Sequence, residues 1–246
     1  MYVSELSLSN YRNYSRLHLN LETGAILLQG NNAQGKTNLL EALYYLSTTT
    51  SPHARSDRQL INWLTLKQDV LPFTRLEALV KRDGGTVQLA ITVVNEGERF
   101  KKEIRQNGVK KRAMDVIGKL NVVMFLPEDI ALVSGSPSLR RRYIDGVLCQ
   151  VDSEYCRALS HYNKLLPQRN ALLKELAERR RSPDQLAYWD QQLAEYGALL
   201  VTRRHNAILD LDTMARKYHR TLSDGQEGLR LYYVPSFDAH DQPAPD

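Results

Sequence analysis

The chain has 246 residues, of which 42% are hydrophobic and 25% are charged, as is usual for globular proteins, and its length suits one large domain or two small ones. No apolar run approaches the roughly 18 residues of a membrane helix, and the N-terminus lacks the basic and apolar segments of a signal peptide, so we expect a cytoplasmic protein with no membrane partner. The net charge of +5 is unevenly spread, because residues 137–222 hold 15 Lys and Arg against 10 Asp and Glu while the rest of the chain holds 18 of each.

The first 50 residues predict two strands and a helix. Leu17, Leu19 and Leu21 alternate with polar residues, which is the period of a half-buried strand. The apolar run 25–28 lies between two glycines and predicts a strand buried on both faces. Leucines at helical spacing over residues 39–46 then predict a helix directly after that strand.

Four more strands are predicted before residue 127. Segments 76–80 and 86–94 flank Asp83-Gly84-Gly85, a strong hairpin signal. Segment 100–105 leads into a second turn of this kind at Asn107-Gly108, and the apolar run 121–126 predicts one more strand.

Helical spacing dominates from Pro137. Apolar residues recur helically over 165–176 and again over 186–214, on either side of a short polar turn. This pattern predicts an antiparallel helical hairpin that projects from an α/β body. Strand character returns over 229–234, so we expect a body at 1–136, a helical lobe at 137–222 and a return strand within 223–246.

The positive excess of the helical lobe has two interpretations. It is expected of a stretch that approaches nucleic acid, but the solvated face of a long amphipathic helix looks the same. Three consecutive arginines at the hairpin tip are the candidates for contact with DNA phosphates: Arg179, Arg180 and Arg181. Arg140, Arg141 and Arg142 fan over roughly 200° of a helix and cannot all face one duplex.

The two cysteines predict no disulfide. Cys149 and Cys156 are seven residues apart in a helical pattern, which separates them by roughly 10 Å on a continuous helix. This distance is too long to bridge, so two inert thiols are expected.

Residues 30–37 carry the clearest chemistry of the chain. The segment reads G-N-N-A-Q-G-K-T and fits the phosphate-loop pattern G-x4-G-K-[ST] at every position. Its glycines let backbone N–H groups curl around phosphates at a helix N-terminus, Lys36 reaches the β- and γ-phosphates, and the Thr37 hydroxyl joins a Mg²⁺ shell. The sequence therefore predicts an ATP and Mg²⁺ site, whose candidate residues are Gly30, Asn31, Asn32, Ala33, Gln34, Gly35, Lys36, Thr37 and Asn38.

The flanks of this loop resemble one family. The segments L-S-N-Y-R-N-Y at 8–14 and T-N-L-L-E-A at 37–42 resemble the RecF and SMC-like branch of ABC-type ATPases. F-L-P-E-D at 125–129, G-S-P at 135–137 with R-R-Y-I-D at 141–145, and Q-R-N-A-L-L-K at 168–174 narrow this resemblance to RecF. The resemblance covers essentially the whole chain and implies an α/β fold, an ABC-type ATPase body with a mixed sheet and a β-subdomain.

This resemblance adds candidate residues to the site. It places the Asn-Tyr-Arg turn beside the nucleotide, so Arg12 and Asn13 are candidates for phosphate contacts. An ion pair between Arg12 and an acid at a strand end is the alternative. The resemblance also places Pro127-Glu128-Asp129 in a loop that senses Mg²⁺, although acids at a helix N-terminus also suit its dipole.

Two further ABC-type motifs are not found. Residues 122–129 and 207–212 imitate a Walker B strand, but a proline interrupts the first and a helical pattern contains the second. L-S-D-G-Q at 222–226 imitates the signature motif, which should open a helix, whereas a strand is predicted to follow it. We therefore expect the C-terminal part of the ATPase fold to be missing, and expect ATP binding without turnover by this chain.

The resemblance implies an ATP-dependent DNA-binding protein of repair and replication, which would be associated with the nucleoid. Such a protein would form a homodimer with ATP on double-stranded, gapped or junction DNA and would act with RecR and RecO to load recombinase. The alternatives are the ATPase module of an SMC-like structural protein or of an ATP-dependent nuclease. Arms of the SMC type need heptads over far more residues than 137–222, and no paired-carboxylate nuclease constellation is found.

Overall fold

The computed structural model describes residues 1–97, 99–179 and 183–235, which form two compact units, 1–136 and 137–246. The division falls where helical spacing begins in the sequence. Among the described residues, no helix is long and apolar enough to cross a membrane.

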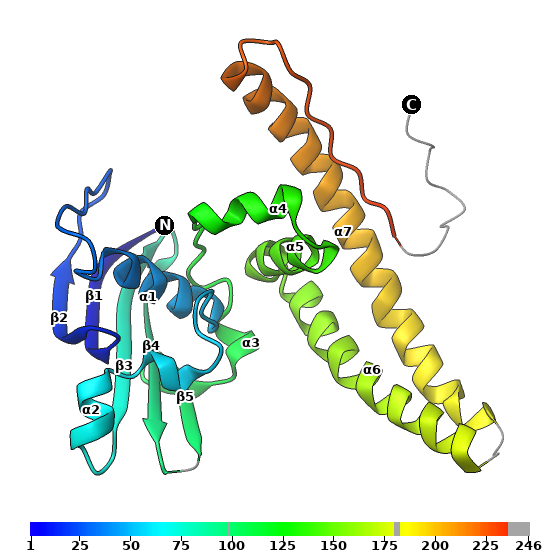
Figure 1. The fold of residues 1–246 in the computed structure, drawn as a ribbon, viewed down its shortest axis with the longest axis horizontal. Coiled ribbons are helices and arrows are strands. Elements are labelled where there is room, and N and C mark those ends of the chain that lie inside the picture. Colours follow the sequence, from blue (N-terminus) through cyan, green and yellow to red (C-terminus); the bar gives the residue numbers. More distant parts are fainter. Residues whose placement is uncertain (98, 180–182, 236–246) are drawn as a thin grey trace. The chain divides into compact units, whose positions relative to one another are not determined.

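The first unit is built on a six-stranded antiparallel sheet with the strand order β2-β1-β3-β4-β5-β6 (Figure 1). The strands are β1 (Tyr2–Tyr11), β2 (Tyr14–Asn20), β3 (Phe73–Arg82), β4 (Gly85–Asn95), β5 (Phe100–Gln106) and β6 (Val109–Lys111). Both predicted hairpin turns are confirmed, since β3 joins β4 at Asp83-Gly84 and β5 joins β6 at Asn107-Gly108. The predicted strand at 17–21 is confirmed as β2.

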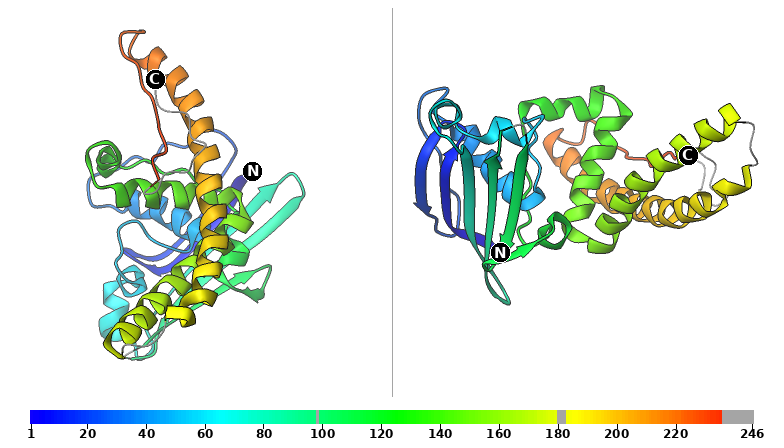
Figure 2. Two further views of the ribbon diagram at one scale, coloured as in Figure 1. Left: turned by 90° about the vertical axis from the view of Figure 1, so that its right-hand side faces the viewer. Right: turned by 90° about the horizontal axis from the view of Figure 1, so that it is seen from below.

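Period-2 alternation gives this sheet one apolar face. Cross-strand pairing sets a row of side chains across five strands, namely Leu17, Leu8, Leu76, Ile91 and Ile104. Helix α1 (Lys36–Thr48) lies against the sheet (Figure 2). It packs on the apolar face through Leu39, Ala42, Tyr45 and Leu46. Burying each such leucine contributes roughly 1.5–3 kcal/mol, so this contact fixes where the helix, and the loop before it, lie on the sheet.

Short elements complete the first unit. They are η1 (Asp57–Leu60), α2 (Trp63–Gln68), α3 (Ala113–Val116), η2 (Pro127–Ile130) and α4 (Ala131–Ser134).

Three predicted strands are wrong. Segments 25–28, 121–126 and 229–234 have no regular secondary structure, and several of their apolar side chains are exposed: Ile26, Leu27, Val123, Phe125, Tyr232 and Val234. A strand needs a neighbour for its backbone N–H and C=O groups, and no described strand pairs with these segments. All strand pairs of the described sheet are antiparallel, so the parallel strands of the expected mixed sheet are not among the described residues.

The second unit is helical. It contains α5 (Pro137–Val151), α6 (Ser153–Arg179), η3 (Pro183–Leu186) and α7 (Ala187–Leu222). Helices α6 and α7 pack side by side, which confirms the predicted helical hairpin (Figure 1). Ile144, Leu148, Tyr155, Ala158 and Leu200 form its small core.

A half-buried ion pair joins the three helices. Arg204 of α7 contacts Asp145 of α5 at 2.8 Å and donates a hydrogen bond to the Tyr155 hydroxyl of α6 at 2.9 Å. Tyr155 in turn donates to Asp145. The Asp145 carboxylate is thus bonded by side chains of both α6 and α7, and these bonds hold α5 against the two helices.

The expected separation of the two thiols is wrong. Helix α5 ends at Val151, and Asp152 accepts hydrogen bonds from the backbone N–H groups of Glu154 and Tyr155, so it caps the start of α6. The resulting corner puts Cys149 on α5 and Cys156 on α6 with their side chains interacting, whereas a continuous helix would hold them two turns apart.

Candidate nucleotide-binding site

The phosphate loop, residues 30–37, leads directly into α1. Three of its residues have positive φ, namely Gly30 (151°), Ala33 (63°) and Gly35 (100°), and Gly35 is the N-cap of the helix. The helix start has no side-chain cap and no acidic residue in its first turn. The first N–H groups of a helix have no intrahelical acceptor, and here no side chain caps them either, which is the arrangement that binds phosphate.

Lys36 is folded onto the loop itself. Its Nζ donates hydrogen bonds to the carbonyl oxygens of Gly30 at 2.8 Å and Asn31 at 2.7 Å. These bonds tie the two ends of the loop together through one cation. The ammonium thus lies within the loop, where a bound phosphate would meet it.

The turn between β1 and β2 binds the same loop through Asn13 and Tyr14, and these contacts are called the clasp below. Asn13 donates from Nδ2 to the Gln34 carbonyl at 3.1 Å and accepts at Oδ1 from Asn38 at 2.8 Å. Tyr14 donates to the Gly35 carbonyl at 3.0 Å. The structure therefore brings Asn13 to the loop, as the sequence predicted for its position, and adds Tyr14, which sequence reasoning missed.

Gly35 is required by this clasp. A Cβ atom there would lie 2.6 Å from Asn13 Nδ2 and 2.9 Å from the Tyr14 hydroxyl. A side chain at position 35 would displace the ends of Asn13 and Tyr14, and the positive φ is itself unfavourable for any other residue. Of the two loop glycines, Gly35 is therefore restricted by contacts as well as by its backbone, since a Cβ on Gly30 would meet nothing within 4 Å.

Arg12 forms an ion pair, as in the alternative that the sequence left open, but its partner Glu41 lies within α1 and not at a strand end. Its Nη2 and Nε lie 2.6 and 2.9 Å from the two carboxylate oxygens of Glu41, and its Nη1 donates to the Gln59 carbonyl. Tyr11 and Ser51 also donate to Glu41, which is only 1% exposed. A phosphate contact by Arg12 stays a prediction.

The electrostatics of this pair follow from its partners. Burial raises the pKa of Glu41, but the hydrogen bonds from Arg12 and Ser51 outweigh it and hold the pKa below its usual value. For Arg12, burial lowers the pKa and the bonds to Glu41 raise it above its usual value. Both groups are therefore charged at neutral pH, and they fasten the β1–β2 turn to α1 one helical turn beyond Thr37.

Sequence reasoning noted Glu41 only as part of the motif. The signal that could have identified it is its position four residues after Thr37, on the helix face that leads back to the loop. A buried glutamate on an otherwise apolar face needs a cation, and Arg12 of the matching motif supplies one.

The two predicted metal residues lie on different elements. Thr37 is exposed in the first turn of α1, and Glu128 is exposed in η2. Asp129 accepts a hydrogen bond from the Leu126 N–H at 2.8 Å, so this neighbouring acid caps the turn. Among residues 1–97, 99–179 and 183–235, no group of three His, Cys, Asp or Glu side chains is arranged to hold a metal.

Two of the three motif imitations lie in or at the end of a helix, although the strand expected after residues 222–226 is not found in the described part of the chain. Residues 207–212 lie within α7 and are not a strand. L-S-D-G-Q at 222–226 ends α7 and opens no described helix, because Ser223 is the C-cap and the Gly225 N–H bonds the Arg220 carbonyl at 2.8 Å. This is a helix-terminating turn with Asp224 and Gly225 at positive φ.

The predicted DNA contacts at the hairpin tip fall mostly outside the described residues. Arg179 is the last residue of α6, and Arg180 and Arg181 are not described. Arg140, Arg141 and Arg142 are all exposed on α5.

Comparisons with known proteins agree with this geometry. A family profile described as an AAA ATPase domain matches residues 1–115. The DNA replication and repair protein RecF of Roseiflexus castenholzii is 44% identical over 96% of this chain and 63% of its own length. That of Herpetosiphon aurantiacus is 42% identical over 99% of this chain and 66% of its own length.

Two solved structures that resemble this chain are also of RecF proteins. A structure described as the recombination mediator protein RecF with ATP, in the RecFOR pathway, superposes with a TM-score of 0.82 at 33% identity, over 91% of this chain and 58% of that chain. A second, described as RecF-ATPrS, has a TM-score of 0.81. The chain thus has an α/β P-loop ATPase fold and spans less than two thirds of the length of these relatives.

Proposed function

The chain belongs to the RecF family over the part of that family's length that it spans, and we propose that it binds ATP through residues 30–37 as an ATP-dependent DNA-binding protein of replication and repair. The observation that carries this proposal is the loop itself. An uncapped helix N-terminus, a motif lysine within the loop and a clasp of Asn13 and Tyr14 form one preorganised phosphate cradle.

The residues present fit a magnesium nucleotide. Mg²⁺ commonly takes one or two protein oxygens and completes its shell with water and phosphate, so it needs no acidic cluster. We propose that the Thr37 hydroxyl supplies one oxygen and that Glu128 holds a metal-bound water. The ion, when bound with ATP, would neutralise phosphate charge.

We further propose that two copies of the chain dimerise on DNA. Its support is the family relationship and the positive excess of residues 137–222, which suits a phosphate backbone. ATP would bring two copies of the chain together over duplex DNA, and RecR and RecO would act with it in loading recombinase onto gapped DNA. The hairpin tip at Arg179, Arg180 and Arg181 is the proposed contact with phosphates.

Replacing Lys36 with Met tests the ATP site. The ammonium is the one motif cation of the loop, so we expect binding of a fluorescent ATP analogue to fall below detection in equilibrium titration. Lys164→Met, which removes an exposed lysine of α6, should bind the analogue as the original chain does. Unchanged affinity in Lys36→Met would remove the phosphate-loop assignment.

The same proteins test the assembly. Sedimentation with and without ATP and duplex DNA should show a dimer only when nucleotide is present, and Lys36→Met should stay monomeric. Strand cleavage by the pure chain would instead favour an ATP-dependent nuclease.

A further inference from the structure

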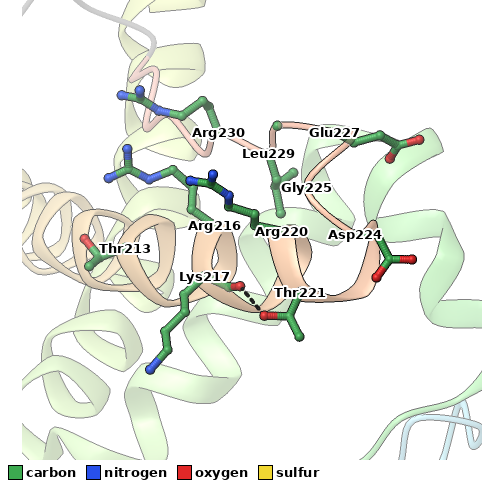
Figure 3. Close-up of a pocket in the computed structure, with 11 residues that line it drawn as sticks. Thr213, Arg216, Lys217, Arg220, Thr221, Asp224, Gly225, Glu227, Leu229 and Arg230 are labelled. Atoms are coloured by element: carbon green, nitrogen blue, oxygen red, sulfur yellow. Dashed lines mark hydrogen bonds between the residues drawn. The ribbon is translucent and has the colours of Figure 1, made fainter.

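A pocket of about 880 Å³ lies at the end of α7, far along the chain from the phosphate loop. It is formed by the last turns of the helix, the turn that ends it and the first residues of the return segment, defined here as 228–235 (Figure 3). Four basic side chains line this basic pocket, namely Arg216, Lys217, Arg220 and Arg230. Two acids, Asp224 and Glu227, line it as well.

The turn after α7 shapes the pocket. Asp224 and Gly225 adopt positive φ, and the Gly225 N–H bonds back to the Arg220 carbonyl, so the chain reverses direction within a few residues. The return segment then runs back along α7 (Figure 1). The Leu231 N–H donates to Asp212 Oδ1 at 2.7 Å, and the Tyr233 ring meets the His205 ring edge-on.

The basic residues are arranged by helical spacing. Asp212, Arg216 and Arg220 follow one another at intervals of four, so they form a stripe on one face of α7 with a rise of about 6 Å between neighbours. Arg230 joins them from the return segment. Figure 3 shows the guanidinium groups of Arg216, Arg220 and Arg230 gathered on one side of the helix, with Lys217 directed elsewhere.

One buried carboxylate faces these arginines. Asp212 is 7% exposed, and Arg216 and Arg230 approach it at 3.2 and 3.7 Å. No ion pair to Arg220 occurs among the described residues, and all three guanidinium groups are exposed. Three cations around a single anion leave an excess of positive charge that a further anion would neutralise.

The lining acids do not cancel this excess. Glu227 lies 3.5 Å from His219, and Figure 3 shows Asp224 and Glu227 at the end of the pocket away from the three guanidinium groups. The basic side of the pocket is thus free to accept an anionic ligand from solvent.

We propose that this basic pocket holds phosphodiester groups of the DNA backbone, a contact that rests on the proposed DNA binding. Guanidinium groups match phosphate oxygens with paired N–H donors, so three of them on two elements can hold adjacent backbone phosphates. The helical side of the pocket, with Arg216, Lys217 and Arg220, lies within residues 137–222, the part of the chain that carries the positive excess.

Salt-dependent binding of a short fluorescein-labelled duplex to the 246-residue chain tests the proposal. Arg220→Gln is the cleanest variant, because Arg216 and Arg230 still neutralise Asp212. Between about 50 and about 200 mM salt, the slope of log K against log salt should be shallower by about one in Arg220→Gln. In Arg220→Gln/Arg230→Gln it should be shallower by about two.

Arg157→Gln is the matched control, since it removes an exposed arginine from α6 of the same unit. Its slope should equal that of the original chain, and circular dichroism should show the same helix content in all variants. If the original chain binds DNA and Arg220→Gln keeps its slope, or if Arg157→Gln changes as much, the pocket is not a DNA contact although DNA binding stands. If the original chain does not bind duplex DNA at any salt concentration, the proposed function itself fails.

Discussion

Glu41 shows how a single residue of the motif supports the site without touching the nucleotide loop. Its two oxygens accept hydrogen bonds from Tyr11 at the end of β1, from Arg12 in the turn after β1, and from Ser51 in the segment after α1. A buried carboxylate of this kind is stable only while its donors are present. Its effect on the loop is indirect, because it fixes the turn that carries Asn13.

Replacing Glu41 with Gln should lower the free energy of unfolding by roughly 3 kcal/mol. This loss is at the lower end of the range for breaking a buried ion pair, because the Arg12 side chain is 21% exposed to solvent. Glu103→Gln removes an acid from an exposed pair with Arg105, where water screens the charges, so it should cost much less than Glu41→Gln. Urea denaturation at neutral pH measures both, and equal costs would contradict the supporting role of Glu41.

The same variant has a defined pH dependence. Because the folded-state pKa of Glu41 is held below its unfolded value of about 4.3, the stabilisation is present above that pH and is lost as pH falls through the folded pKa. The difference in unfolding free energy between the original chain and Glu41→Gln should therefore shrink below about pH 4. A difference that grows in acid would show that the carboxylate is not the stabilised form.

At the scale of elements, the sequence predicted best those strands whose partner strands lie within the described residues. The hairpins at Asp83-Gly84 and Asn107-Gly108 have turn residues and alternating strands that agree, so local and cross-strand preferences lead to one register. The phosphate loop was predictable from its spacing alone. Its clasp by Tyr14 was not, because that contact joins segments about 20 residues apart and depends on how α1 packs on the sheet.

The errors have a common physical cause. Segments 25–28, 121–126 and 229–234 are apolar enough for strands, but apolar composition specifies burial and not a partner. Without a neighbouring strand their backbone groups have no ladder to join. Similarly, the thiol separation was misjudged because helical spacing continues through 149–156 although Asp152 ends one helix and caps the next.

The clasp on the phosphate loop predicts the effect of adding one methyl group. Gly35→Ala should destabilise the chain by about 1–2 kcal/mol for its positive φ, plus the cost of displacing Asn13 and Tyr14. Gly30→Ala has a positive φ but no atom within 4 Å, so it should cost less. Chemical denaturation of both variants, and of Gly35→Ala with Asn13→Ala, would show whether removing the neighbour relieves the strain. Equal costs for the two glycines would mean that the clasp is not tight.

At the scale of the whole molecule, the chemistry is divided between two units with separate cores. The phosphate loop belongs to residues 1–136 and the basic pocket to 137–246. An ATP-dependent DNA-binding protein needs the two sites to be coupled in free energy, whatever path carries the coupling. Thermodynamic linkage makes this requirement measurable without any assumption about the path.

If ATP raises the affinity for duplex DNA by some factor, DNA must raise the affinity for ATP by the same factor. We expect a coupling of about 1–3 kcal/mol, which corresponds to roughly 5- to 150-fold. Two titrations with a non-hydrolysable ATP analogue measure it, one of DNA with and without saturating analogue and one of analogue with and without saturating DNA. Lys36→Met should bind DNA as the original chain does without nucleotide and should show no response to the analogue. Arg220→Gln should bind the analogue normally when DNA is absent, since its change lies outside the loop. A factor of one in both titrations would mean that DNA binding by this chain does not depend on ATP, even if both ligands bind.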